Sequence, residues 1–182
     1  SRFPKMPYEI IPNCVSVQDN LPKKNWKKNN EINIVFLSRL HPKKGLEDLI
    51  DALTKLPSHF KLNVYGDGEE SYKAYLLKKC VSSSLVDRVR FYGHVAGPEK
   101  ERAFLSADIF CLPTHSENFG IVIAEALAFG VPVVTTVRAP WQGIIDNKCG
   151  KWVEVSADAV ASALRDLAQE DLEEIGRNGR EW

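Results

Sequence analysis

The chain has 182 residues, 44% hydrophobic and 26% charged, which is typical of a globular domain with a sizeable core. Its lysines plus arginines equal its aspartates plus glutamates at 24 each, and zero net charge argues against a dedicated nucleic-acid binder, which would carry a basic face. No apolar run is long enough to cross a bilayer and no signal peptide is evident, so we expect a cytoplasmic protein whose four dispersed cysteines are reduced thiols.

The first thirty residues differ from the rest of the chain. Four prolines punctuate them, and residues 23–30 (KKNWKKNN) form a polar, basic run. Because proline removes a backbone donor and restricts the residue before it, the sequence predicts an extended connection over residues 1–30. A folded domain is then predicted over residues 31–182.

From residue 32 onward, short apolar runs alternate with longer amphipathic ones. The predicted strands cover residues 32–37, 61–65, 89–92, 109–112, 131–135 and 151–155. The predicted helices cover residues 45–56, 69–81, 98–105, 121–129, 157–168 and 172–180. Strands that alternate with helices predict an α/β fold, a Rossmann-like parallel sheet with helices on both faces. In such sheets ligands bind beyond the carboxyl ends of the strands, where the loops at 38–45, 66–70, 93–97, 113–120 and 136–143 should gather.

The helix predicted over residues 121–129 is almost entirely apolar, which is typical of a buried helix, yet it contains Glu125. A buried carboxylate is costly unless it is paired or hydrogen-bonded, so Glu125 needs a specific partner. Hydroxyl groups of a ligand would supply one. The alternative is a structural partner, such as a backbone donor or an arginine of the same domain.

Glu117 lies in the loop before this helix, eight residues from Glu125, a step of ~12 Å if wholly helical. Between the two carboxylates lie the amides of residues 118–121 at a helix N-terminus, where phosphate oxygens bind readily. Gly120 has no Cβ and permits close approach of a ligand to the backbone. A nucleoside diphosphate sugar, with hydroxyls at both ends and a diphosphate between them, matches this pattern.

Two cations flank the loop after the first predicted strand, Arg39 and Lys44. Both are suited to a diphosphate, the arginine as a planar fork and the lysine as a point charge. The alternative is a surface arginine and a lysine at the start of a helix, as many proteins have. Their coincidence with the glutamate pair favours the diphosphate.

Several short motifs occur in a fixed order and spacing. They are Ile11-Pro12-Asn13, Ser38-Arg39-Leu40, Lys44-Gly45, 65–68 (YGDG), 91–95 (FYGHV), Pro113-Thr114, 117–120 (ENFG), Glu125-Ala126 and 130–135 (GVPVVT). With this set, the chain from about residue 11 to residue 182 resembles the C-terminal, donor-binding domain of a retaining GT-B glycosyltransferase of glycosyltransferase family 4 (glycosyl transferases group 1). The resemblance implies one half of a GT-B fold and an activity as a hexosyltransferase.

The resemblance also implies roles for individual positions. Arg39 and Lys44 match the pair that contacts the donor diphosphate, Glu125 matches the carboxylate at the ribose hydroxyls, and Glu117 matches the catalytic residue at the transferred sugar. The donor phosphate and sugar oxygens are expected at the backbone of Asn118, Phe119, Gly120 and Ile121. The nucleobase is expected to be bordered by Gly66, Asp67, Gly68, His94 and Val95. Such enzymes typically need no metal or other cofactor, the nucleoside diphosphate sugar being the donor substrate.

The acceptor side is less well specified. The resemblance implies an N-terminal GT-B domain that this chain lacks, a glycan or lipid-linked acceptor, and peripheral association of the whole protein with the inner membrane face. The loop at 137–141 (VRAPW) departs from the usual glycine pair and resembles a subset of bacterial surface-polysaccharide enzymes. Trp141 in this loop either lines the acceptor side of the cleft or covers the domain as a hydrophobic lid.

Other functions remain open at this point. A GT-B sugar-nucleotide epimerase would bind the same ligand, and a nucleotide-sugar-binding module would bind it without transfer. A dinucleotide-dependent oxidoreductase is disfavoured, because the loop at 38–45 lacks the G-x-G-x-x-G pattern. The nucleobase, the sugar and the acceptor leave no side-chain signature in the sequence.

Overall fold

The computed structural model describes residues 31–182, so the connection predicted over residues 1–30 lies outside the described residues. The described residues form a six-stranded sheet in the order β3-β2-β1-β4-β5-β6, and every neighbouring pair of strands is parallel. The strands are β1 (Ile32–Leu37), β2 (Phe60–Tyr65), β3 (Val89–Gly93), β4 (Ile109–Leu112), β5 (Val133–Thr136) and β6 (Gly150–Val153). The predicted Rossmann-like α/β fold is confirmed.

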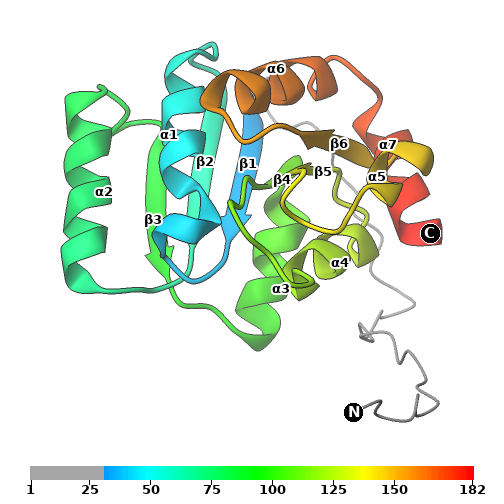
Figure 1. The fold of residues 1–182 in the computed structure, drawn as a ribbon, viewed down its shortest axis with the longest axis horizontal. Coiled ribbons are helices and arrows are strands. Elements are labelled where there is room, and N and C mark those ends of the chain that lie inside the picture. Colours follow the sequence, from blue (N-terminus) through cyan, green and yellow to red (C-terminus); the bar gives the residue numbers. More distant parts are fainter. Residues whose placement is uncertain (1–30) are drawn as a thin grey trace, which may run out of the picture.

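Helices cover both faces of this sheet (Figure 1). They are α1 (Leu46–Thr54), α2 (Glu70–Ser82), α3 (Gly97–Ser106), α4 (Ile121–Ala128), α5 (Gly143–Asp146), α6 (Ala157–Leu167) and α7 (Leu172–Glu181). Helix α1 packs against α6, and α4 packs against α7. The chain runs from β1 outward to β3 and then crosses back to β4, so right-handed connections place α1 and α4 on opposite faces.

All the predicted strands and helices are confirmed, with ends displaced by at most two residues. The largest displacement at the start of a strand is in β5, which begins at Val133 instead of residue 131. Pro132 has no N–H to donate to the ladder, and Gly130 is in a left-handed turn (φ 66°) that ends α4. The sequence missed α5 and the 3₁₀ turn Pro42–Lys44 (η1), which are too short to show a helical period.

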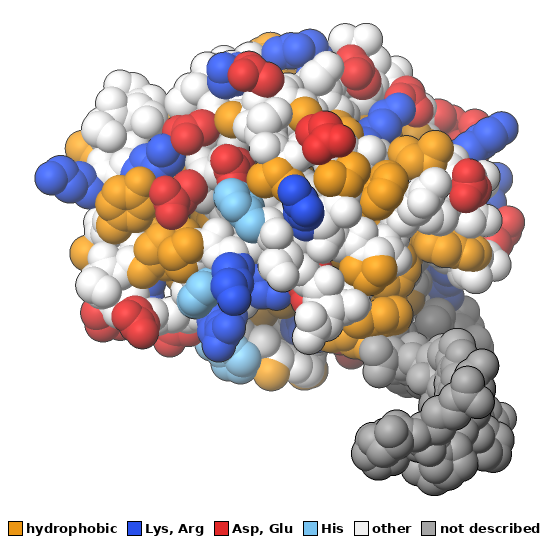
Figure 2. Space-filling view, viewed as in Figure 1, with side chains coloured by type: hydrophobic (Ala, Val, Ile, Leu, Met, Phe, Trp, Pro, Cys, Tyr) orange, Lys and Arg blue, Asp and Glu red, His pale blue; other side chains and the backbone are white. Residues whose placement is uncertain are grey.

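The core lies along the central strands. Every residue of β4 and of β5 is buried, as expected for parallel strands that are covered on both faces. The largest fully buried side chains include Phe36, Phe60, Phe104 and Phe110. On the surface, Figure 2 shows acidic and basic side chains interspersed over the visible face, in keeping with zero net charge.

The loops at the carboxyl edge of the sheet are joined by hydrogen bonds between backbones. Ser38 N–H donates to the Tyr65 carbonyl (3.1 Å), and Gly66 N–H donates to the Gly93 carbonyl (2.7 Å). Across the point where the strand order reverses, the carbonyl of Lys43 accepts from the buried Thr114 hydroxyl and from the His115 amide, both at 2.8 Å. These bonds join the loops after β1, β2, β3 and β4 into a continuous rim.

A glycine is required where the first of these loops meets the fourth. Gly45 has a left-handed backbone (φ 71°), and a Cβ there would lie 1.9 Å from the carbonyl oxygen of Pro113. A side chain at this position would push the loop after β1 away from the loop after β4.

Within residues 31–182, no helix is long and apolar enough to span a membrane. Cys80, Cys111 and Cys149 are buried and form no disulfide. Cys14 lies outside the described residues.

Candidate functional site

A pocket of about 550 Å³ lies at the carboxyl edge of the sheet, between the loops after β1 and β4. It is lined by Leu37, Ser38, Lys44, Lys100, Glu117, Asn118, Phe119, Gly120, Ile121, Val122 and Glu125. Strands β1 and β4 are neighbours at which the strand order reverses, and ligands of open α/β sheets bind in the crevice at such a point. The fold therefore places both predicted carboxylates where a ligand is expected.

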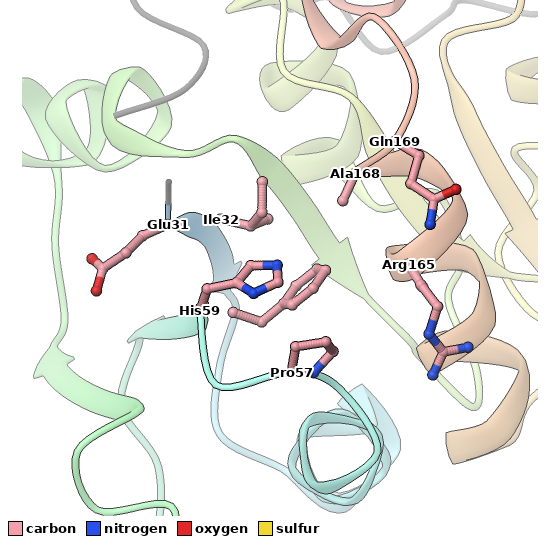
Figure 3. A pocket seen from close by; sticks show the side chains of 8 residues that line it. Glu31, Ile32, Pro57, His59, Arg165, Ala168 and Gln169 are labelled. Atoms are coloured by element: carbon pink, nitrogen blue, oxygen red, sulfur yellow. The ribbon is translucent and has the colours of Figure 1, made fainter. Parts of the chain in front are cut away.

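A pocket of similar size, about 420 Å³, lies at the opposite edge, where β1 and β2 begin (Figure 3). Its lining is largely apolar and includes Ile32, Pro57 and Phe60. The cation beside it, Arg165, donates to the carbonyl of Lys55 at 3.1 Å and so supports the fold. This pocket has no helix N-terminus and no pair of carboxylates, so it lacks the chemistry of the first.

Helix α4 begins in the carboxyl-edge pocket. Gly120 at its N-cap has a left-handed backbone (φ 80°), and no side chain caps the first turn. The amide of Ile123 donates to the carbonyl of Gly120 at 2.8 Å, whereas helix geometry leaves the amides of Ile121 and Val122 without an intrahelical acceptor. With the positive end of the helix dipole, these two amides form a site for anionic oxygens. A Cβ on Gly120 would lie 3.0 Å from Cγ of Glu117, so the glycine also keeps this turn close to the loop before it.

Glu117 and Lys44 meet at one side of the pocket. The lysine Nζ lies 2.5 Å from Oε2 of Glu117, and both side chains are largely withdrawn from water, with 19% and 13% of their surfaces exposed. The other carboxylate oxygen, Oε1, accepts from the Asn118 amide at 3.2 Å. Residues from the loops after β1 and β4 thus form one polar cluster beside the N-terminus of α4.

Glu125 lies in α4, just over one helical turn beyond the first residue of that helix, and its partner is a lysine of α3. Lys100 Nζ lies 2.6 Å from Oε1 of Glu125, whereas Oε2 is buried and has no hydrogen-bond partner among the described residues. The sequence left open a structural partner for Glu125, such as a backbone donor or an arginine. In the structure a lysine, Lys100, is the partner of one of the two carboxylate oxygens. Sequence reasoning missed Lys100, although its position in the first turn after the β3 loop would have directed attention to it.

Trp141 supports the loop that leads into α4. Its indole N–H donates to the carbonyl of Phe119, and the two rings are tilted against each other with centroids 5.2 Å apart. On its other side Trp141 meets Trp182 edge-on at 5.8 Å. The backbone of the same loop contributes as well, because the Arg138 carbonyl accepts from the Glu117 amide at 3.2 Å. The loop after β5 therefore supports the loop that carries Glu117 and Phe119, two of the residues that line the pocket.

The remaining predicted residues lie on the rim and do not line the pocket. Arg39 is exposed on the loop after β1. Gly68 pairs with Leu40 in an isolated bridge, and Asp67 forms an ion pair with Lys73 at 3.0 Å that lowers the pKa of Asp67. His94 is exposed and Val95 half-buried on the loop after β3. The structure thus groups Lys44, Glu117, residues 118–121 and Glu125, and leaves the proposed nucleobase border as a neighbouring rim.

Comparison with known proteins decides the family. The sequence profile of the family described as Glycosyl transferases group 1 matches residues 17–182. The chain belongs to this family. This group 1 glycosyltransferase chain is 32% identical over 178 residues to the GDP-mannose-dependent alpha-(1-6)-phosphatidylinositol monomannoside mannosyltransferase of Mycobacterium tuberculosis. The alignment covers 88% of this chain and 45% of the relative. It is 34% identical over 146 residues to the phosphatidyl-myo-inositol mannosyltransferase of Mycobacterium leprae, covering 76% and 38%.

Solved structures of glycosyltransferases share the fold of this group 1 domain. The crystal structure of Anabaena Alr3699/HepE in complex with UDP and glucose matches with a TM-score of 0.75 and 25% identity, over 84% of this chain and 43% of that one. The C-terminal domain of a glycosyl transferase group 1 protein (LpcC) from Francisella tularensis matches with a TM-score of 0.73 and 25% identity, over 82% and 83%. The chain thus spans less than half the length of the curated relatives above and most of a solved C-terminal domain.

Proposed function

We propose that this chain is the donor-binding domain of a retaining glycosyltransferase, which moves a hexose from a nucleoside diphosphate sugar to a glycan or lipid-linked acceptor. The observation that carries the proposal is the grouping of Lys44, Glu117, the first turn of α4 and Glu125 around one pocket at the reversal of strand order. Two carboxylates on either side of an anion-binding helix end match a donor with hydroxyls at both ends and a diphosphate between them.

In this proposal each group acts on one part of the donor. The diphosphate lies against the N-terminal amides of α4, and Lys44, with Arg39 at the rim, neutralises the charge that grows as the diphosphate leaves. Glu125 accepts from the ribose hydroxyls. Glu117 lies at the transferred sugar, beside the reacting carbon. We propose that these cationic and dipolar groups suffice without a metal ion.

The names of the relatives guide the choice of donor and acceptor. The mycobacterial relative is a GDP-mannose-dependent enzyme that acts on a phosphatidylinositol monomannoside, whereas the Anabaena protein was solved with UDP and with UDP-glucose. GDP and UDP are therefore the first nucleotides to compare. We propose that the whole enzyme has a second domain that binds the acceptor. A lipid-linked acceptor would bring that enzyme to a membrane surface.

The test is calorimetric titration of the chain with UDP, GDP and ADP, and with the matching nucleosides. We expect one diphosphate to bind, and its nucleoside to bind far more weakly, because the pocket contributes charge and amide donors for the diphosphate. The proposed function is wrong if a chain that is folded by circular dichroism binds none of the three.

A further inference from the structure

Lys100 lies in the proposed donor pocket without a role in the donor scheme above. It belongs to α3, which follows the loop after β3, whereas Glu125 belongs to α4. Its ammonium group lies 2.6 Å from Oε1 of Glu125, and the two side chains are only 29% and 22% exposed. Ion pairs that are partly withdrawn from water interact more strongly and are screened less by salt than pairs on an open surface. The contact is therefore suited to fix the carboxylate in one orientation.

The two oxygens of Glu125 differ in what surrounds them. Oε1 is held by Lys100, while Oε2 is buried and has no hydrogen-bond partner among the described residues. Buried polar atoms in folded proteins are nearly always hydrogen-bonded, so an exception requires an explanation. A ligand hydroxyl group that donates to Oε2 would give both oxygens of Glu125 a hydrogen-bond partner. Because the carboxylate is rigid and planar, the contact at Oε1 also restricts where Oε2 can lie.

We propose that Lys100 is a positioning residue, which holds Oε1 of Glu125 so that Oε2 accepts a hydrogen bond from a ribose hydroxyl of the donor. The inference rests on the proposed function, since it assigns the partner of Oε2 to that donor. It predicts that Lys100 acts through Glu125 and has no separate contact with the base or the diphosphate. The contribution of Lys100 should then depend on the presence of both Glu125 and the ribose hydroxyls.

The experiment measures the affinity of the chain for whichever of UDP, GDP and ADP the wild type binds most tightly, and for its 2′,3′-dideoxy counterpart. Lys100→Met should weaken binding of the ribonucleotide about tenfold, within the range of coupling energies between contacting residues, and should leave the dideoxynucleotide within twofold. Lys100→Arg should retain most of the affinity. In a Glu125→Gln background, Lys100→Met should have no further effect.

A matched control is Lys79→Met, which removes a partly buried lysine from its ion pair with Asp51 (2.7 Å), at a site outside the pocket. It should leave both affinities unchanged. The inference is overturned if Lys100→Met weakens the ribonucleotide and the dideoxynucleotide equally, or if it weakens neither. A wild-type chain that binds no nucleoside diphosphate contradicts the proposed function itself, which distinguishes the two failures.

Discussion

The ammonium group of Lys44 and the carboxylate of Glu117 lie 2.5 Å apart, although 73 positions separate the two residues in the sequence. The pair joins the loop after β1 to the loop after β4, and it lies beside the first turn of α4. Each member is also a proposed ligand of the donor, so donor binding must compete with, or add to, an interaction that already exists within the protein.

Lys44→Ala should weaken binding of the nucleoside diphosphate by at least tenfold and leave binding of the nucleoside nearly unchanged. A charge-assisted hydrogen bond contributes about 1.5–3 kcal/mol, and the proposed contact of Lys44 is with the diphosphate alone. Calorimetry with both ligands checks this. Arg39→Ala should show the same selectivity with a smaller loss, because Arg39 is exposed on the rim.

The matched control for Lys44 is Lys43→Ala, since Lys43 is an exposed neighbour in the same 3₁₀ turn and does not line the pocket. It should affect neither ligand appreciably. Equal losses for diphosphate and nucleoside in Lys44→Ala would show that Lys44 does not contact the diphosphate.

Glu125→Gln should reduce affinity for the nucleoside diphosphate by about 10- to 100-fold with little change in melting temperature. The glutamine keeps the size of the side chain but loses the charge that strengthens the proposed hydrogen bonds to ribose, by about 1.5–3 kcal/mol. Titration and thermal melting of the same sample separate the two effects. Unchanged affinity with a large drop in melting temperature would mean that Glu125 is a structural residue paired with Lys100.

Trp141→Phe should lower both stability and nucleotide affinity. It removes the indole N–H that donates to the Phe119 carbonyl, a loss of about 0.5–1.5 kcal/mol, and so loosens the loop that leads into α4. Denaturant unfolding and calorimetry provide the two readouts. Trp152→Phe is the control, because Trp152 donates to the carbonyl of Ala139 (3.0 Å), which does not line the pocket, whereas Phe119 does. If Trp152→Phe lowered affinity as much as Trp141→Phe, the support of the pocket would not be specific to Trp141.

The buried thiols should react slowly with disulfide reagents at pH 8. Burial raises the pKa of Cys80 and Cys149 to about 11 and raises that of Cys111 as well, so about one thiol in a thousand or fewer is the reactive thiolate at pH 8. Labelling of a Cys14→Ser chain should be slow when native and fast in guanidinium chloride. Fast, complete labelling of the native chain at pH 8 would contradict the burial of these side chains.

The chain by itself should bind a nucleoside diphosphate and transfer no sugar. Positioning an acceptor hydroxyl against the donor contributes on the order of 7–11 kcal/mol to such reactions, and the proposed acceptor-binding domain would have to supply it. Product analysis with GDP-mannose and UDP-glucose is the measurement. The whole enzyme should transfer with retention at the anomeric carbon. Transfer by the chain at an ordinary enzymatic rate would contradict the two-domain proposal.

Sequence reasoning predicted the elements well and the contacts between them less well. Strands such as β4 and helices such as α4 show their type in short apolar runs and in the polar loop between them. The family motifs then placed Glu117 and Glu125 on the correct loop and helix. Nothing in a linear pattern says which cation will meet which carboxylate, because that depends on how distant loops fold together. Lys100 was missed for this reason, and Arg39 and Lys44 looked equivalent until only Lys44 was found in the pocket.

The hydroxyl of Thr114 and the amide of His115 both donate to the carbonyl of Lys43, which fastens one wall of the crevice to the other. The walls therefore cannot part without breaking both of these hydrogen bonds, and the domain should move as one rigid piece. A nucleotide therefore binds to a pocket that is already formed, so its binding loses little free energy to the ordering of loops. In the proposed two-domain enzyme, closure around a substrate would then come from movement of this rigid domain relative to the acceptor-binding domain.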